Sequence, residues 1–198
     1  MVKRLFSKNF LPFGFFPFLT GFFLACTGIF TMLDIIEDIN DLLHFFSLVF
    51  FGIGALEIIY ALQMKKENSN KKWNIALGIF TASIGLIIQT EQTHYVEILS
   101  FYIGILLIFR STISFNLGLD VLSHAPHKGI IALVSSFILF GLGGMLVWKP
   151  ELFKTSQISW IGISLLYSGF VNIYIYDAFK KISTQAVVDF KKNHFVNI

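Results

Sequence analysis

Six long apolar segments alternate with short polar segments along the chain. A helix that crosses a bilayer needs about 20 mainly apolar residues, because lipid cannot satisfy bare backbone hydrogen-bonding groups. The apolar segments have or approach this length, and no polar separator is long enough to hold a soluble domain. The pattern therefore predicts a single membrane domain, 1–198, with six spanning helices at 13–33, 42–62, 73–90, 96–118, 129–148 and 158–177.

The composition also indicates a location in lipid. Of the 198 residues, 55% are hydrophobic, 14% are charged and 24 are phenylalanine. A soluble domain typically carries about 25% charged residues, and a fold of this size has too little interior to bury so much apolar surface. This composition excludes a soluble globular protein and a disordered chain, and a single cysteine, Cys26, excludes a disulfide scaffold.

The distribution of basic residues predicts the orientation. Twelve of the fifteen Lys and Arg residues fall on the side that holds both termini and the loops after the second and fourth spans. The other side has Lys149 and Lys154, and Arg110 falls inside a span. Because cytoplasmic loops carry an excess of Lys and Arg, we expect both termini in the cytoplasm. A signal peptide ending at Cys26 is the weaker alternative, since cleavage there would delete the first span.

Small residues recur at fixed places in the six spans. Shifts of 57 and then 58 residues superpose three pairs of spans without a gap, and each span then has Gly or Ser at two positions seven residues apart. Seven residues is nearly two turns, so both positions share one helix face. Small residues on such a face allow neighbouring backbones to approach closely. The predicted helix-packing residues are Gly21, Gly28, Ser47, Gly54, Gly78, Gly85, Gly104, Ser111, Ser136, Gly143, Gly162 and Gly169.

The repeat predicts an all-α fold. We expect an integral membrane six-helix bundle built from three tandem parallel αα-hairpin repeats, with approximate threefold symmetry about the membrane normal. The units are 13–62, 70–119 and 128–177, and they are followed by a cytoplasmic tail, 178–198.

These tandem hairpins resemble the HdeD-like acid-resistance membrane proteins. The third unit carries the resemblance best, with Gly141, Gly143, Gly144, Pro150, Gly162 and Gly169, whereas Ile35 and Gln92 stand at the proline position of the first two units. The resemblance covers 13–177 and implies a multi-pass inner-membrane protein of bacterial acid resistance and stress response. It brings no catalytic residues to carry over.

Two ionisable residues, Glu57 and Arg110, lie inside predicted spans. Each costs about 2.5–3.5 kcal/mol near a helix centre, which the surrounding apolar residues offset. In the repeat, Glu57 corresponds to Ser114 and Asn172, so a polar residue recurs there in every unit. Arg110 lies four residues, about 6 Å, from this level, within reach of its side chain. An ion pair that clamps two helices is the preferred interpretation; the alternatives are a substrate or proton site and two unrelated charges.

Four acidic residues, Asp34, Glu37, Asp38 and Asp41, lie between the first two spans. If this segment is helical, their spacing gathers four carboxylates on one face. Crowded carboxylates bind protons more readily than isolated ones, so the cluster is a candidate sensor of external acid. A solvated acidic loop is the simpler interpretation.

No phosphate loop, metalloprotease, hydrolase or dinucleotide motif is present in the sequence. We therefore expect no enzyme, no cofactor, no metal and no nucleic-acid partner. The leading hypothesis is a non-enzymatic inner-membrane protein of the acid-resistance type, whose partners are the lipid bilayer and either another membrane protein or a second copy. One alternative is a small proton-linked transporter or channel, which predicts a polar cavity at Glu57 and Arg110. The other is a scaffold or assembly factor, which predicts a closed bundle with small residues facing lipid or a partner.

Overall fold

The computed structural model describes residues 15–33, 39–63, 70–90, 95–148 and 157–195, and its regular structure in these ranges is entirely helical. Each predicted span overlaps one helix. All six helices in the described ranges are long and apolar enough to cross a membrane, which confirms the all-α prediction for these ranges and supports a multi-pass membrane protein. The helices are α3 (Phe15–Met32), α4 (Ile39–Gln63), α5 (Asn70–Thr90), α6 (Tyr95–Leu122), α7 (Pro126–Trp148) and α8 (Gln157–Phe195).

A three-residue turn joins α6 to α7. The amides of His124 and Ala125 both donate to the carbonyl of Val121, which ends α6 within one turn. Pro126 then begins α7, where its fixed φ suits a helix start and its missing N–H would have had no helical partner. So short a connection makes α6 and α7 antiparallel neighbours.

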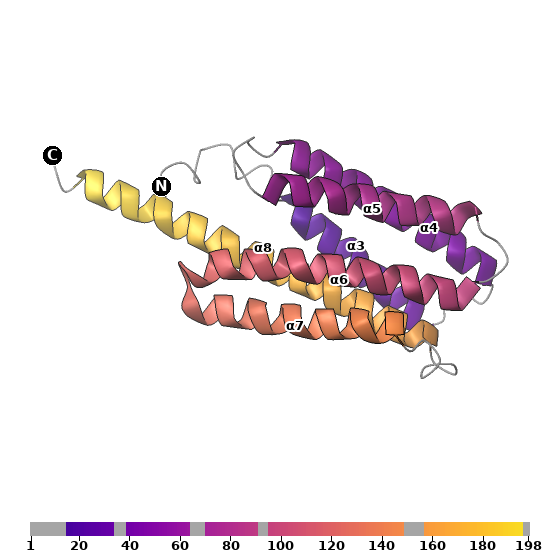
Figure 1. Cartoon of the computed structure of the whole chain (residues 1–198). Helices are drawn as coiled ribbons and strands as arrows, with labels where there is room; N and C mark the ends of the chain where they lie inside the picture. Colours follow the sequence, from indigo (N-terminus) through magenta and orange to yellow (C-terminus); the bar gives the residue numbers. More distant parts are fainter. Residues whose placement is uncertain (1–14, 34–38, 64–69, 91–94, 149–156, 196–198) are drawn as a thin grey trace.

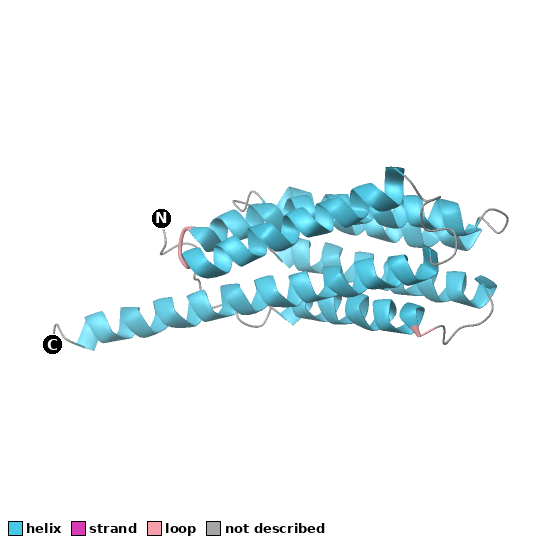
Figure 2. Ribbon diagram, turned by 90° about the horizontal axis from the view of Figure 1, so that it is seen from below, coloured by secondary structure: helices cyan, strands magenta, loops and turns pink. Residues whose placement is uncertain are grey.

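The six helices form one up-and-down bundle (Figures 1 and 2). The three closest pairs are α4 with α5, α6 with α7, and α3 with α8. The two helices within each predicted hairpin unit also touch, but less extensively. The closest packing therefore joins one unit to the next, and the contact of α3 with α8 joins the first unit to the third.

The core is filled mainly by the second helix of each unit. Large side chains of α4, α6 and α8 are fully buried in one cluster that includes Phe46, Phe50, Leu106, Leu107 and Leu165. Many other large apolar side chains are exposed on the outside, such as Leu48, Phe137 and Trp148. An outward apolar surface of this kind suits lipid, which is as apolar as the core itself.

Helix α8 is longer than its membrane span. The apolar part is Ile158–Ala178, but the helix continues to Phe195. This continuation projects past the end of the bundle at which the α6–α7 turn lies (Figure 1). The segment 178–198, which we predicted as a tail, is thus helical up to Phe195 and continuous with the last apolar helix.

Candidate functional site

All twelve predicted packing residues are buried. Ten of them face one another across the three closest helix pairs: Gly21 with Gly169, Gly28 with Gly162, Ser47 with Gly85, Gly54 with Gly78, and Gly104 with Gly143. The remaining two, Ser111 on α6 and Ser136 on α7, donate their hydroxyls to carbonyls of their own helices. The face that carries the repeat in the sequence is therefore the face by which each helix meets its closest partner.

The crossing of α4 and α5 shows why a small residue is needed there. A Cβ placed on Gly54 would lie 2.6 Å from the carbonyl oxygen of Gly78 and 2.5 Å from the amide nitrogen of Ala82, which are backbone atoms that cannot move aside alone. Seven residues earlier, the Ser47 hydroxyl donates to the carbonyl of Gly85 at 2.7 Å. By contrast, a Cβ on Gly52 of the same helix would meet nothing within 4 Å.

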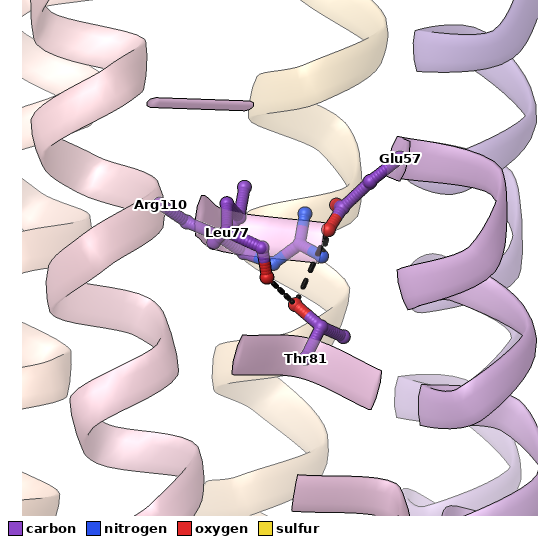
Figure 3. A network of polar contacts seen from close by, with 4 residues as sticks. All are labelled: Glu57, Leu77, Thr81 and Arg110. Atoms are coloured by element: carbon purple, nitrogen blue, oxygen red, sulfur yellow. Dashed lines mark hydrogen bonds and ion pairs between the residues drawn. The ribbon is translucent and has the colours of Figure 1, made fainter. Parts of the chain in front are cut away.

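The two charges inside the spans form an ion pair between α4 and α6. Arg110 donates from Nη2 to Oε1 of Glu57 at 2.5 Å (Figure 3). Only 3% of the side-chain surface of Arg110 and 10% of that of Glu57 remain exposed. The structure therefore has the ion pair between Glu57 and Arg110 that we preferred as the interpretation of the sequence. Each charge compensates the other in a place where neither would be stable alone.

A third helix contributes Thr81 to the same site. Its hydroxyl lies 3.2 Å from Oε2 of Glu57 and 2.8 Å from the carbonyl oxygen of Leu77, one turn earlier on α5 (Figure 3). A hydroxyl has a single proton and therefore donates to one of these acceptors at a time. Thr81 is fully buried. Glu57, Thr81 and Arg110 together connect α4, α5 and α6, and we call them the polar clamp.

Sequence reasoning did not identify Thr81. The repeat search singled out positions that are polar in every unit, and the equivalents of Thr81 in the other two units are Leu24 and Leu139. A hydroxyl inside a span is too common to attract notice alone. Its role becomes visible only once the contact of α4 with α5 is known.

The two residues equivalent to Glu57 lie on other helices. Ser114 of α6 is buried, and Asn172 of α8 is partly buried beside Gly21 of α3. Within the described helices, Glu57 has hydrogen bonds only from Arg110 and Thr81. Ser114 and Asn172 are polar like Glu57, but neither is bonded to the Glu57 carboxylate.

Three buried polar side-chain atoms have no hydrogen-bond partner among the described residues. They are Nε of Arg110 on α6 and the hydroxyl oxygens of Ser164 and Ser168 on α8. Ser168 occupies in the third unit the position that Arg110 occupies in the second. The ion pair therefore uses Nη2 of the guanidinium and leaves Nε of the same group without a partner among the described residues.

The predicted acidic cluster is described only in part. Asp34, Glu37 and Asp38 lie outside the described residues, and Asp41 is exposed in the first turn of α4. One turn further along α4, the ring Nδ1 of His44 lies 3.0 Å from Oε1 of Gln89 on α5. Across the helices and the turn that the structure describes, no three His, Cys, Asp or Glu side chains come together to hold a metal ion.

Comparisons of the chain with protein-family models, with curated proteins and with solved structures found no match.

Proposed function

We propose that this chain is a non-enzymatic, multi-pass inner-membrane protein of the acid-stress type, in which the polar clamp stabilises the bundle. The observation that carries the proposal is the enclosure of both intramembrane charges. Glu57 and Arg110 compensate each other's charge, and large apolar side chains of α4, α6 and α8 fill the core of the bundle. The acid-stress class is supported by the resemblance of the glycine-bearing hairpins to HdeD-like proteins.

The packing supports three tandem repeats as the organisation of this bundle. In each close pair, the second helix of one unit meets the first helix of another, through the same small-residue positions. Such recurrence is the arrangement that approximate threefold symmetry would produce. The excess of basic residues favours a cytoplasmic position for both termini, and with them for the extension of α8.

An acid-survival assay tests the structural role of the clamp. Cells that lack the chromosomal gene would be given the wild-type chain, Glu57→Gln, Arg110→Gln or the double variant, and survival after acid challenge would be compared with the amount of folded protein in the membrane. We expect survival to follow the folded amount in every variant. A variant that is fully folded and yet fails to protect would show that the charges act chemically, which would overturn the structural role.

A proton-linked transporter is the second candidate function. It is favoured by a carboxylate inside a span and by the unpartnered polar atoms of Arg110, Ser164 and Ser168, because intramembrane ionisable groups commonly mark ion pathways. Proton flux into liposomes separates the two functions. The structural role predicts the same flux for wild type and Glu57→Gln, at the level of protein-free vesicles. Transport predicts a flux that Glu57→Gln abolishes.

A scaffold function is favoured by a different observation on the outer surface. A Cβ on Gly141 or Gly144 of α7 would meet nothing within 4 Å, so these glycines leave room for another helix to approach. Cysteine crosslinking from α7 in native membranes tests this function. A discrete crosslinked protein would support a scaffold, and lipid-only labelling would contradict it.

A further inference from the structure

Hydroxyl groups inside the bundle normally have a partner on their own or a neighbouring helix. Thr27, Thr31 and Ser136 each donate to the carbonyl four residues earlier, and Ser47 donates across to α5. A serine or threonine in a helix commonly satisfies its hydroxyl in this way. Ser164 and Ser168 are exceptions within the described part of the chain, since neither hydroxyl has a protein partner.

The two serines share one face of α8 and are both only 1% exposed. They are four residues apart, which places them one above the other on the helix. Ile161, three residues before Ser164, and Leu165, which lies between the two serines in the chain, belong to the central core cluster. The hydroxyls therefore lie in the apolar interior and away from lipid headgroups.

Register places Ser168 at the level of Arg110. The shifts of 57 and 58 residues superpose Ile53 of α4, Arg110 of α6 and Ser168 of α8. All three are buried, and α6 and α8 are in direct contact. Alternate helices of the bundle run in the same direction (Figure 1), so equivalent residues on α6 and α8 are expected at a similar height along the bundle. Figure 3 also shows the ribbon of α8 passing behind the guanidinium group.

Three unpartnered polar atoms in an apolar interior destabilise the fold, because each has lost the hydrogen bonds that it would make to water in the unfolded chain. Buried polar groups that the protein leaves unsatisfied are usually satisfied by internal water, which makes about three hydrogen bonds. A neutral ligand suits this site better than an anion, because Glu57 already compensates the charge of Arg110.

We propose that the bundle binds internal water between α6 and α8. Nε–H of Arg110 donates to the first water, and the Ser168 hydroxyl bonds to the same molecule. Ser164, one turn away, extends the hydrogen bonding to a second water. The site hydrates the donor of Arg110 that does not contact Glu57, and it is independent of the proposed acid-stress function.

Nuclear magnetic resonance can detect this water directly. The chain has two arginines, Arg4 and Arg110, so an Arg4→Lys protein labelled with ¹⁵N-arginine gives a single Nε–H signal from the site. We expect transfer of magnetisation from water to this proton, and a weaker transfer in Ser168→Ala. If Nε–H receives magnetisation from aliphatic protons alone, the proposal is wrong. The Arg4→Lys protein decides this even if Ser168→Ala does not fold.

Thermal unfolding in detergent gives an independent test. Hydroxyls that bind water and hydroxyls that are unsatisfied predict changes in Tm of opposite sign when the serines are replaced. If the hydroxyls hold water, Ser164→Ala and Ser168→Ala each break a hydrogen-bonded network and lower Tm by about 2–4 °C. If the hydroxyls are simply unsatisfied, their removal relieves a cost and raises Tm. Ser136→Ala is the matched control, since its hydroxyl bonds only within its own helix. A Tm that is unchanged or raised in both α8 variants would contradict a water site at the serines.

Discussion

Arg110 and Glu57 are 53 residues apart in the chain, yet their side chains meet at 2.5 Å inside the bundle and join α6 to α4. Both belong to helices that are long and apolar enough to cross a membrane. The pair therefore joins two such helices through buried charges that compensate each other.

The first prediction is that the two charges are energetically coupled. Removal of one partner from a buried ion pair leaves an uncompensated charge and costs about 3–5 kcal/mol. We expect Glu57→Gln and Arg110→Gln each to destabilise the bundle, and the double variant to cost clearly less than the two single effects added together. The free energy of unfolding in mixed micelles measures this cycle.

The control for this cycle is the exposed ion pair of Asp177 and Lys181 on α8. Oδ2 of Asp177 lies 2.9 Å from Nζ of Lys181. Exposed ion pairs contribute at most about 1 kcal/mol, so Asp177→Asn should leave stability nearly unchanged. Additive effects of the two buried substitutions would show that Glu57 and Arg110 do not stabilise each other.

The second prediction concerns Thr81. Thr81→Val keeps the shape of the side chain and removes the hydroxyl that bonds to Glu57 and Leu77. Hydrogen bonds between membrane helices are worth on average about 0.6 kcal/mol, so we expect a small but measurable loss of stability in the same unfolding assay. Thr81→Ser retains the hydroxyl and serves as the control. Equal losses for Val and Ser would show that packing, and not the hydrogen bond, matters at this position.

The third prediction compares two glycines on α4. Gly54→Ala forces the backbones of α4 and α5 apart, and overpacking of this kind costs about 1–3 kcal/mol. Gly52→Ala meets open space and removes a residue with poor helix propensity, so stability should be unchanged or slightly higher. Thermal unfolding of the two variants side by side measures the difference. If both alanines are tolerated equally, the close approach at Gly54 is not required for stability.

The fourth prediction fixes the orientation. In a Cys26→Ser background, one cysteine would replace Ser123 in the α6–α7 turn and another, in a separate protein, would replace the exposed Gln89 near the end of α5. The distribution of basic residues predicts that a membrane-impermeant thiol reagent added to intact cells labels the cysteine at 89 and not the one at 123. The reverse pattern would place both termini outside the cytoplasm.

The sequence allowed the spans and the packing residues to be predicted because both depend on local pattern. Hydrophobic length identifies a span, and a seven-residue spacing such as that of Gly21 and Gly28 identifies a face. What the spacing could not indicate was the partner of each face. Gly54 meets Gly78 and Gly28 meets Gly162, and nothing in the twelve positions distinguishes those pairings from contacts within one hairpin.

The polar site could also be predicted from the sequence only in part. Glu57 and Arg110 were conspicuous because charges are rare in apolar spans, and the reach of arginine made their pairing plausible. Thr81, Ser164 and Ser168 were not conspicuous, since their importance depends on which hydroxyls find partners after folding. The acidic cluster stays a prediction, because three of its four residues lie outside the described residues and Asp41 is exposed.

The contact of α3 with α8 has a consequence for biosynthesis. Helices emerge from the ribosome in chain order, so α4 gains its close partner α5 soon after insertion, and α6 gains α7 after a turn of three residues. The glycine face of α3, at Gly21 and Gly28, has no such neighbour until α8 has been translated. A nascent chain that has stalled before α8 therefore displays this face to other membrane proteins, including any quality-control protease, and the finished chain conceals it.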